Sequence, residues 1–208
     1  MSKIGFGFPP ATAYFSPYDG SLGVAPTAAQ GSSKVWLDTK IASASSTLDF
    51  ETGLDGTYPS YLFIIAGLKP SATAGFWLRI SIDGGATYKS GALEYGYVLD
   101  GRNNSGTALT QSSGAGDSKI ILQSSVNGVS ATAGFNGHIM CNDIASGLFE
   151  KTFHITNYYV EATTAVGAHS VGGGKYSADS SPINAVRFFP STGNFSSGSI
   201  SLYGIKSS

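Results

Sequence analysis

The chain has 208 residues with 12 Lys and Arg against 13 Asp and Glu, so its formal net charge is −1. Only 12% of the residues are charged, about half the usual share, which excludes nucleic-acid binding through a basic patch, an acidic tail and a coiled coil. With 41% apolar residues the chain can fold, and its length fits one domain with an appendage. So few charges also indicate that partners cover part of its surface.

The first 33 residues are dense in Pro and Gly, which exclude helix interiors and central strands. We predict an extended N-terminal docking arm over residues 1–33 and one domain over residues 34–208. The arm carries five aromatic side chains, each large enough to anchor it on a partner: Phe6, Phe8, Tyr14, Phe15 and Tyr18.

From Lys34 onward, short apolar or alternating runs are separated by turn residues, as in a sandwich or barrel. The abundance of Gly, Thr, Tyr and Phe favours strands over helices. We therefore predict an all-β fold, an antiparallel two-sheet β-sandwich of jelly-roll type with about ten strands. The predicted strands cover residues 34–41, 46–50, 60–66, 75–82, 92–99, 118–123, 134–141, 151–161, 183–189 and 197–203.

Alternation is clearest in the fourth run, where Phe76, Leu78, Ile80 and Ile82 share the predicted core face. Trp77, Arg79 and Ser81 share the opposite face. Two connections between the predicted strands are longer than a hairpin loop, and they cover residues 100–117 and 163–182. We predict two long loops there, displayed outward.

The segment from Ser81 to Tyr88 matches the pattern S-x-D-x-G-x-T-aromatic, the Asp-box found on sialidase propellers. The pattern predicts a tight turn in which Gly84 and Gly85 take positive φ, Asp83 accepts backbone N–H bonds and Tyr88 packs beneath. The Asp-box occurs once, and the chain lacks the repeated blades of a sialidase propeller, so a structural turn explains the pattern.

The sequence offers no clear catalytic or metal site, and no cofactor is predicted. Glu94 and Glu161 fall inside predicted strands and are the acids to consider for a glycosidase pair, with an exposed strand face as the alternative. The three histidines, His138, His154 and His169, lack the spacing of a zinc site. No serine-hydrolase elbow, phosphate loop or dinucleotide fingerprint is present, and the single cysteine, Cys141, is predicted to be a small core residue.

Aromatic residues are the strongest binding feature, because tyrosine faces can stack on sugars while amides bond to hydroxyls. Core packing and subunit contact explain the same residues. The candidate glycan contacts are Trp77, Asn103, Asn104, Tyr158 and Tyr159.

Two segments resemble virion proteins of tailed bacteriophages, residues 58–70 with a Tyr-x-x-Tyr strand and residues 76–88 with a Leu-Arg-x-Ser-x-Asp-Gly-Gly hairpin. The ending over residues 185–205 is similar to the last hairpin of that family, and the likeness covers about residues 34–208. It implies a jelly-roll module of tail fibres, head fibres or capsid decoration, homo-oligomeric and without catalytic residues. A long fibrous N-terminal region is missing, which favours a small decoration, collar or tail-tip subunit.

We therefore expect a non-enzymatic virion structural protein, synthesised in the host cytoplasm and located in the virion. Its expected partners are other virion proteins of the capsid, collar or tail and copies of itself, with a trimer favoured. A carbohydrate-binding module for host-surface glycans is the alternative, and a glycan depolymerase is a third hypothesis. No window is long and apolar enough to cross a membrane, and no signal peptide is expected.

Overall fold

The computed structural model describes residues 33–107, 112–130, 133–162 and 165–207, together with two short strands near the N-terminus. Those two, β1 (Ala13–Phe15) and β2 (Leu22–Val24), pair antiparallel with each other. Every other regular element is also a strand, and they are β3 (Lys34–Ile41), β4 (Leu48–Phe50), β5 (Ser60–Pro70), β6 (Ala74–Ser81), β7 (Tyr95–Asn103), β8 (Ser112–Asp117), β9 (Ile120–Val126), β10 (Phe135–Asn142), β11 (Lys151–Val160), β12 (Gly167–Tyr176), β13 (Ala185–Pro190) and β14 (Phe195–Ile205).

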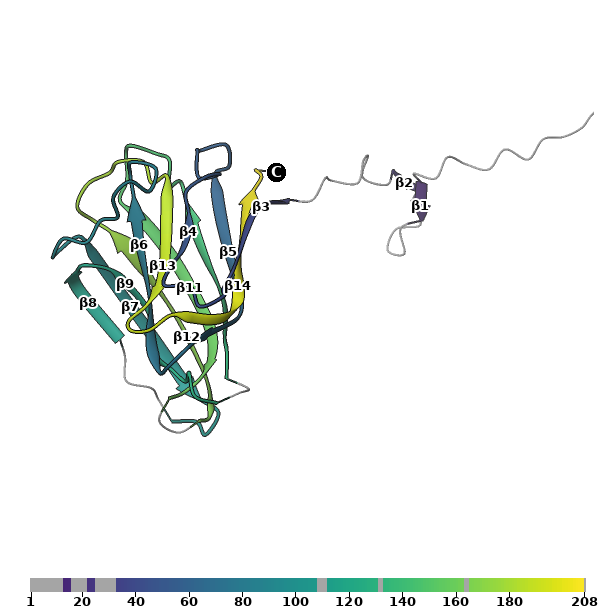
Figure 1. Cartoon of the computed structure of the whole chain (residues 1–208). Helices are drawn as coiled ribbons and strands as arrows, with labels where there is room; N and C mark the ends of the chain where they lie inside the picture. Colours follow the sequence, from purple (N-terminus) through teal and green to yellow (C-terminus); the bar gives the residue numbers. More distant parts are fainter. Residues whose placement is uncertain are drawn as a thin grey trace, which may run out of the picture. The chain divides into compact units, whose positions relative to one another are not determined.

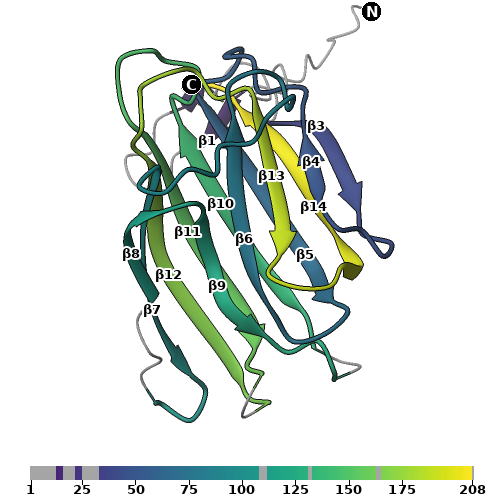
Figure 2. The ribbon, with the colours of Figure 1, turned by 60° about the vertical axis from the view of Figure 1, so that its left-hand side comes forward.

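From Lys34 onward the chain forms two antiparallel sheets, which confirms the predicted all-β class. The wide sheet has eight strands in the order β3-β14-β5-β10-β11-β12-β7-β8, and the narrow sheet has four in the order β4-β13-β6-β9. Figures 1 and 2 show the narrow sheet lying across one face of the wide sheet, so the arrangement is that of a sandwich. The jelly-roll type of this sandwich stays a prediction.

All ten predicted strands are present, but the two predicted long loops are wrong in part. Residues 100–117 include β8, and residues 163–182 include β12, which is an interior strand of the wide sheet between β11 and β7. Both strands are rich in Gly and poor in the β-branched residues on which a strand prediction depends. Gly172 shows why β12 needs glycine, because a Cβ there would lie 2.0 Å from the carbonyl oxygen of Val98 on β7.

A single core lies between the sheets. Phe63 of β5 meets Phe50 of β4 and Phe188 of β13 edge to face, each with ring centroids 5.3 Å apart. The predicted core face of β6 is confirmed for Phe76 and its two successors on that face, which are all at most 1% exposed.

One buried polar contact also joins the sheets. Asn157 of β11 donates its amide to the carbonyl oxygen of Leu122 on β9 (3.1 Å) and accepts a bond from the hydroxyl of Ser170 on β12 (2.8 Å). Since a buried polar group without a partner is costly, this contact fixes how β9 sits over the wide sheet.

The N-terminal arm was predicted as a docking segment. Phe6, Phe8 and Tyr18 lie outside the described residues, and of Tyr14 and Phe15 only the strand backbone of β1 is described. Among the described residues, no helix is long and apolar enough to cross a membrane.

Candidate functional site

The outward surface of the wide sheet, away from the core, carries mostly uncharged side chains, and we call it the plain face. The strand register aligns one row across seven strands: Trp36, Tyr203, Leu62, Met140, His154, Gly173 and Val98. A second row beside it contains Thr39, Ser201, Ile64, His138, Thr156, Val171 and Asp100.

The charged side chains of the plain face come from its flanking strands, such as Lys34 on β3, Lys175 on β12 and Asp100 on β7. In its middle, the outward positions of β14, β10, β11 and residues 60–66 of β5 hold no Asp, Glu, Lys or Arg. Several large apolar side chains reach solvent across the whole plain face, among them Trp36 on β3 at 61%, Tyr158 on β11 at 52% and Val171 on β12 at 49% exposure. Surfaces of this kind mark interaction sites in soluble proteins.

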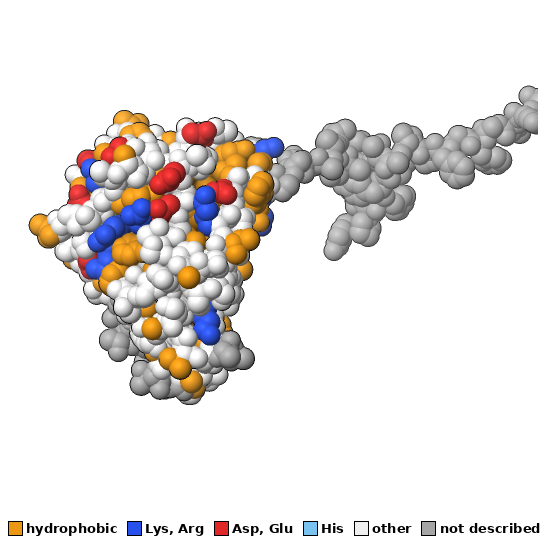
Figure 3. Space-filling view, in the orientation of Figure 1, with side chains coloured by type: hydrophobic (Ala, Val, Ile, Leu, Met, Phe, Trp, Pro, Cys, Tyr) orange, Lys and Arg blue, Asp and Glu red, His pale blue; other side chains and the backbone are white. Residues whose placement is uncertain are grey.

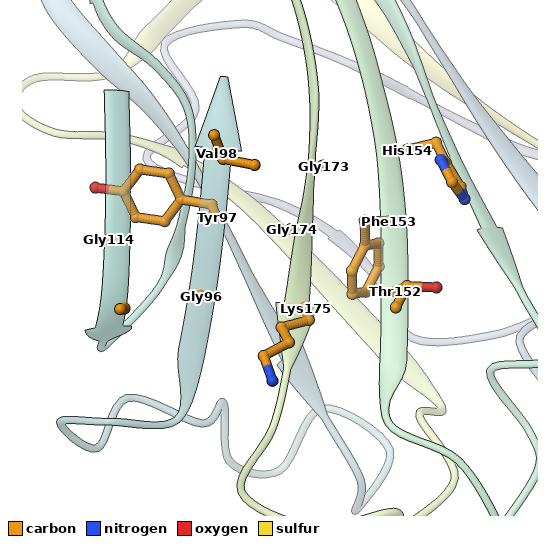
Figure 4. A pocket seen from close by; sticks show the side chains of 11 residues that line it. Gly96, Tyr97, Val98, Gly114, Thr152, Phe153, His154, Gly173, Gly174 and Lys175 are labelled. Atoms are coloured by element: carbon orange, nitrogen blue, oxygen red, sulfur yellow. The ribbon is translucent and has the colours of Figure 1, made fainter. Parts of the chain in front are cut away.

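Two shallow hollows cross the plain face and share His154. One, of about 560 Å³, is lined by Leu62, Ile64, His138 and Met140, and Lys34 of the edge strand β3 also lines it. The other, of about 450 Å³, lies over β11, β12, β7 and β8. Figure 4 shows why the second hollow exists: glycines leave stretches of β7, β12 and β8 without side chains, while Val98, Thr152, His154 and Lys175 stand around them.

The three histidines all lie on the plain face, on the neighbouring strands β10, β11 and β12. His138 and His154 both line the hollow of about 560 Å³. Within the described ranges no group of three His, Cys, Asp or Glu side chains could hold a metal ion.

The outward surface of the narrow sheet is different, and we call it the charged face. Three cations each lie over an aromatic ring: Lys119 over Trp77 (4.7 Å from nitrogen to ring centroid), Arg79 over Phe189 (4.9 Å) and Arg187 over Tyr88 (3.9 Å). Figure 3 shows blue Lys and Arg side chains gathered over this sheet with red acidic side chains among them.

Acidic groups pair with two of these cations. Asp49 of β4 binds Arg187 of β13 through two hydrogen bonds of 2.9 and 2.7 Å, and this bonding raises the pKa of the Arg187 guanidinium. Asp117 accepts a bond of 2.8 Å from Lys119. Such bonds to a charged partner are shorter and stronger than neutral ones.

The predicted turn after β6 is confirmed. Gly84 and Gly85 have φ values of 73° and 91°. Asp83 accepts bonds from the Thr87 amide (2.9 Å), the Thr87 hydroxyl (2.5 Å) and the Ser81 hydroxyl (2.6 Å). These bonds lower the pKa of Asp83 to about 2, with the bond from Ser81 the largest cause. Ser81 is fully buried instead of lying on an exposed face, because its hydroxyl completes this turn.

The five candidate glycan contacts are not brought together. Trp77 is half-buried on the charged face, beneath Lys119 and against Phe189 at 5.5 Å between ring centroids. Tyr158 is on the plain face, so it lies on the other side of the sandwich. Tyr159 is only 1% exposed and lies in the core, which removes it from any surface contact.

Tyr158 and the two asparagines do lie at the same end of the wide sheet. Asn103 pairs with Ala168, next to His169, the partner of Tyr158. The backbone N–H of Asn104 donates to the carbonyl oxygen of Gly167 (2.8 Å), while the Asn103 side chain accepts bonds from its own turn.

The two acids considered for a glycosidase pair are far apart. Neither is inside a strand, since Glu94 precedes β7 and Glu161 follows β11. The register places them at opposite ends of the wide sheet, with Tyr95 beside Tyr176 and Lys151 at one end and Val160 beside Gly167 at the other. A ten-residue strand is about 30 Å long, whereas paired glycosidase carboxyls are at most about 9.5 Å apart. These two acids therefore cannot act as such a pair.

Two side chains with reactive groups, Cys141 and Lys151, are buried inside the protein. Cys141 is 0% exposed, as predicted, and burial raises the pKa of its thiol to about 12. Lys151 is also buried, which lowers its pKa, and its ammonium donates to the carbonyl oxygens of Ser146 and Phe149. The lysine therefore holds the loop before β11.

Sequence reasoning missed the arginine arrangement on the charged face. Arg79 and Arg187 are direct cross-strand partners, as are Trp77 and Phe189 two positions away. The available signal was that both strands place an arginine and an aromatic two residues apart on their outward side.

Comparison with protein-family models finds no match, and comparisons with curated proteins and with solved structures find none either.

Proposed function

We propose that the protein is a non-enzymatic structural subunit of a tailed-bacteriophage particle, and that copies of it assemble through the plain face. The observation that carries the assembly is the uncharged middle of that face, where Leu62 of β5, Met140 of β10 and His154 of β11 lie side by side on neighbouring strands. The virion role is supported by the resemblance of residues 34–208 described above.

A second copy is the occupant that this face suits best. Since its middle holds no formal charge, two copies can meet there without like-charge repulsion. Eight strands spaced about 4.8 Å apart and about 26 Å long present roughly 1,000 Å². A stable interface needs about 800 Å² from each partner, so the plain face is large enough.

The test is the mass of the full chain in solution, measured by light scattering during size-exclusion chromatography. Val171→Lys places a charge on the plain face, where the neighbouring Asp100 lets the monomer accept it. We expect the dissociation constant to rise roughly a hundredfold, because taking an added charge out of water into an apolar interface costs several kcal/mol. The matched control is Val129→Lys, since Val129 is 83% exposed but lies in the loop between β9 and β10.

A wild-type chain that is monomeric, or that responds equally to both substitutions, would contradict assembly through this face. An even number of copies is expected where the face meets itself. A trimer would place the face against a different surface of its neighbour, and the measured mass separates these cases. Docking by the arm is tested separately: a variant lacking residues 1–33 that still occupied particles at full copy number would contradict it.

A second candidate function is carbohydrate binding at the end of the plain face that holds Tyr158 and Asn104. It is favoured by the exposed Tyr158 ring and by the closeness of Asn104 to the adjacent Gly167. A glycan array probed with wild type and Tyr158→Ala tests it, and an array without any bound glycan would remove it.

A further inference from the structure

Two of the three arginines in the chain lie directly opposite each other on the charged face. Arg79 is on β6 and Arg187 on β13, and the antiparallel register makes them cross-strand partners. Like charges in this position repel each other and destabilise a sheet unless anions lie between or beside them. The question is therefore which anions neutralise the pair.

Among the described residues, only Arg187 of these two arginines forms an ion pair with a carboxylate. Asp49 binds it with two hydrogen bonds, and its guanidinium also stacks on Tyr88. The nearby Glu51 accepts a bond of 3.3 Å from the Tyr88 hydroxyl, and Asp117 pairs with Lys119. Asp49 and Asp117 thus each have a cation as partner, while Glu51 is bonded to a neutral hydroxyl beside Arg187.

Arg79 is left with most of its donors available. Its Nε donates to the carbonyl oxygen of Ser118 (3.0 Å), and its guanidinium lies over Phe189. In the part of the chain that the structure describes, no ion pair reaches Arg79, and no buried side-chain nitrogen lacks a hydrogen-bond partner. The two Nη groups of the half-buried Arg79 therefore face solvent.

We infer that Arg79 binds the carboxylate of an acidic side chain from a partner protein. A guanidinium held in place by stacking and by one bond at Nε presents its remaining donors as a fork, which matches a carboxylate. One unneutralised cation calls for one carboxylate, so the expected partner segment carries a single Asp or Glu at this point.

A protein partner fits better than an acidic sugar. The three rings beside the arginines, Trp77, Phe189 and Tyr88, each have a cation over one face, and Trp77 and Phe189 also pack against each other. They offer no open platform of the kind on which a sugar ring stacks. The site is independent of assembly through the plain face, because it lies on the other side of the sandwich.

The test follows the side-chain Nε–H resonances of the full chain labelled with ¹⁵N-arginine. Three arginines give three resonances, and Arg→Lys variants assign them. The probes are a short Gly-Ser peptide with one central glutamate, the same peptide with glutamine, and methyl glucuronide, all at low ionic strength. We expect the glutamate peptide to shift the Arg79 resonance progressively through the titration and to move that of Arg187 with it.

Arg102, which lies on the plain-face side of β7, is the internal control and should not shift. In Arg79→Lys the affinity for the glutamate peptide, followed on Arg187, should fall about tenfold, because lysine keeps the charge but loses the fork. Equal shifts with the glutamine peptide, or equal shifts of Arg102, would overturn the site. Tighter binding of methyl glucuronide than of the glutamate peptide would overturn the protein partner.

Discussion

The two outward faces of the sandwich differ more than any other two regions of the molecule. The plain face has uncharged side chains such as Leu62 and Met140 at its centre, while the charged face has Arg79 and Arg187 at its centre. Both sheets bury their inward faces in the same core, so burial in the core does not explain why the two outward faces differ. The difference therefore concerns what each face meets after folding.

Each face is suited to a different environment. On the charged face the side chains bind one another, as Asp49 binds Arg187, and such a surface is stable in water. On the plain face, the apolar side chains of Trp36, Val98 and Val171 are exposed to water, which is unfavourable. Burying that apolar area against another surface would stabilise the resulting complex by roughly 25 cal/mol per Å², which favours association through the plain face.

The largest effect is expected when the wide sheet itself is disturbed. In Gly172→Ala the new Cβ would lie 2.0 Å from the Val98 carbonyl oxygen and 2.9 Å from the Leu99 Cα, so β7 and β12 must separate. We expect the free energy of unfolding to fall by about 3 kcal/mol, measured by urea denaturation. The control is Gly147→Ala, where nothing lies within 4 Å, and an equal loss in both would contradict the explanation.

The next effect comes from removing one buried polar contact between the two sheets that carry the faces. Asn157→Ala leaves the Leu122 carbonyl oxygen and the Ser170 hydroxyl without their buried partner. The expected loss is about 2 kcal/mol of unfolding free energy, again by urea denaturation. Asn142→Ala, at an exposed position of β10, should change stability by less than about 0.5 kcal/mol; a similar loss there would remove the inter-sheet role of Asn157.

A smaller effect is expected from breaking the ion pair of the charged face. Asp49→Asn removes the carboxylate that holds Arg187, and both side chains are partly exposed at 21% and 32%. We expect a loss of about 1 kcal/mol that shrinks at high salt, measured in a double-mutant cycle with Arg187→Gln. A coupling that salt leaves unchanged would show that packing on Tyr88, not charge, holds the pair together.

The smallest effect concerns the turn that leads from β6 to Tyr88 on the charged face. The pKa of Asp83 is about 2 in the folded chain against an ordinary 3.8, so the folded state binds fewer protons than the unfolded state between these values. Its stabilising contribution is therefore present above about pH 4 and is lost as the pH falls through 2. The melting temperatures of wild type and Asp83→Ala should differ at pH 6 and converge near pH 2; a constant difference would mean that the carboxylate is not responsible.

Local patterns predicted much of the fold. Alternation in residues 75–82 assigned the core face of β6, and the Asp-box spacing assigned the turn at Asp83, because both depend on neighbours within a few residues. The same reasoning failed for β8 and β12, where Gly-rich segments form strands because neighbouring backbones approach closely. It also placed Tyr159 among the surface aromatics, although the register turns that side chain into the core.

The sequence by itself determined the all-β class, the positions of ten strands and the scarcity of charge. Only the tertiary structure decided where that charge lies, because strand pairing joins residues that are distant in the sequence. Arg79 and Arg187 become neighbours through the pairing of β6 with β13, and Leu62, Met140 and His154 become one row through the pairing of β5, β10 and β11. Alternation along a strand shows which side of the sheet a residue faces. The register between strands shows which residues of other strands become its neighbours on that side.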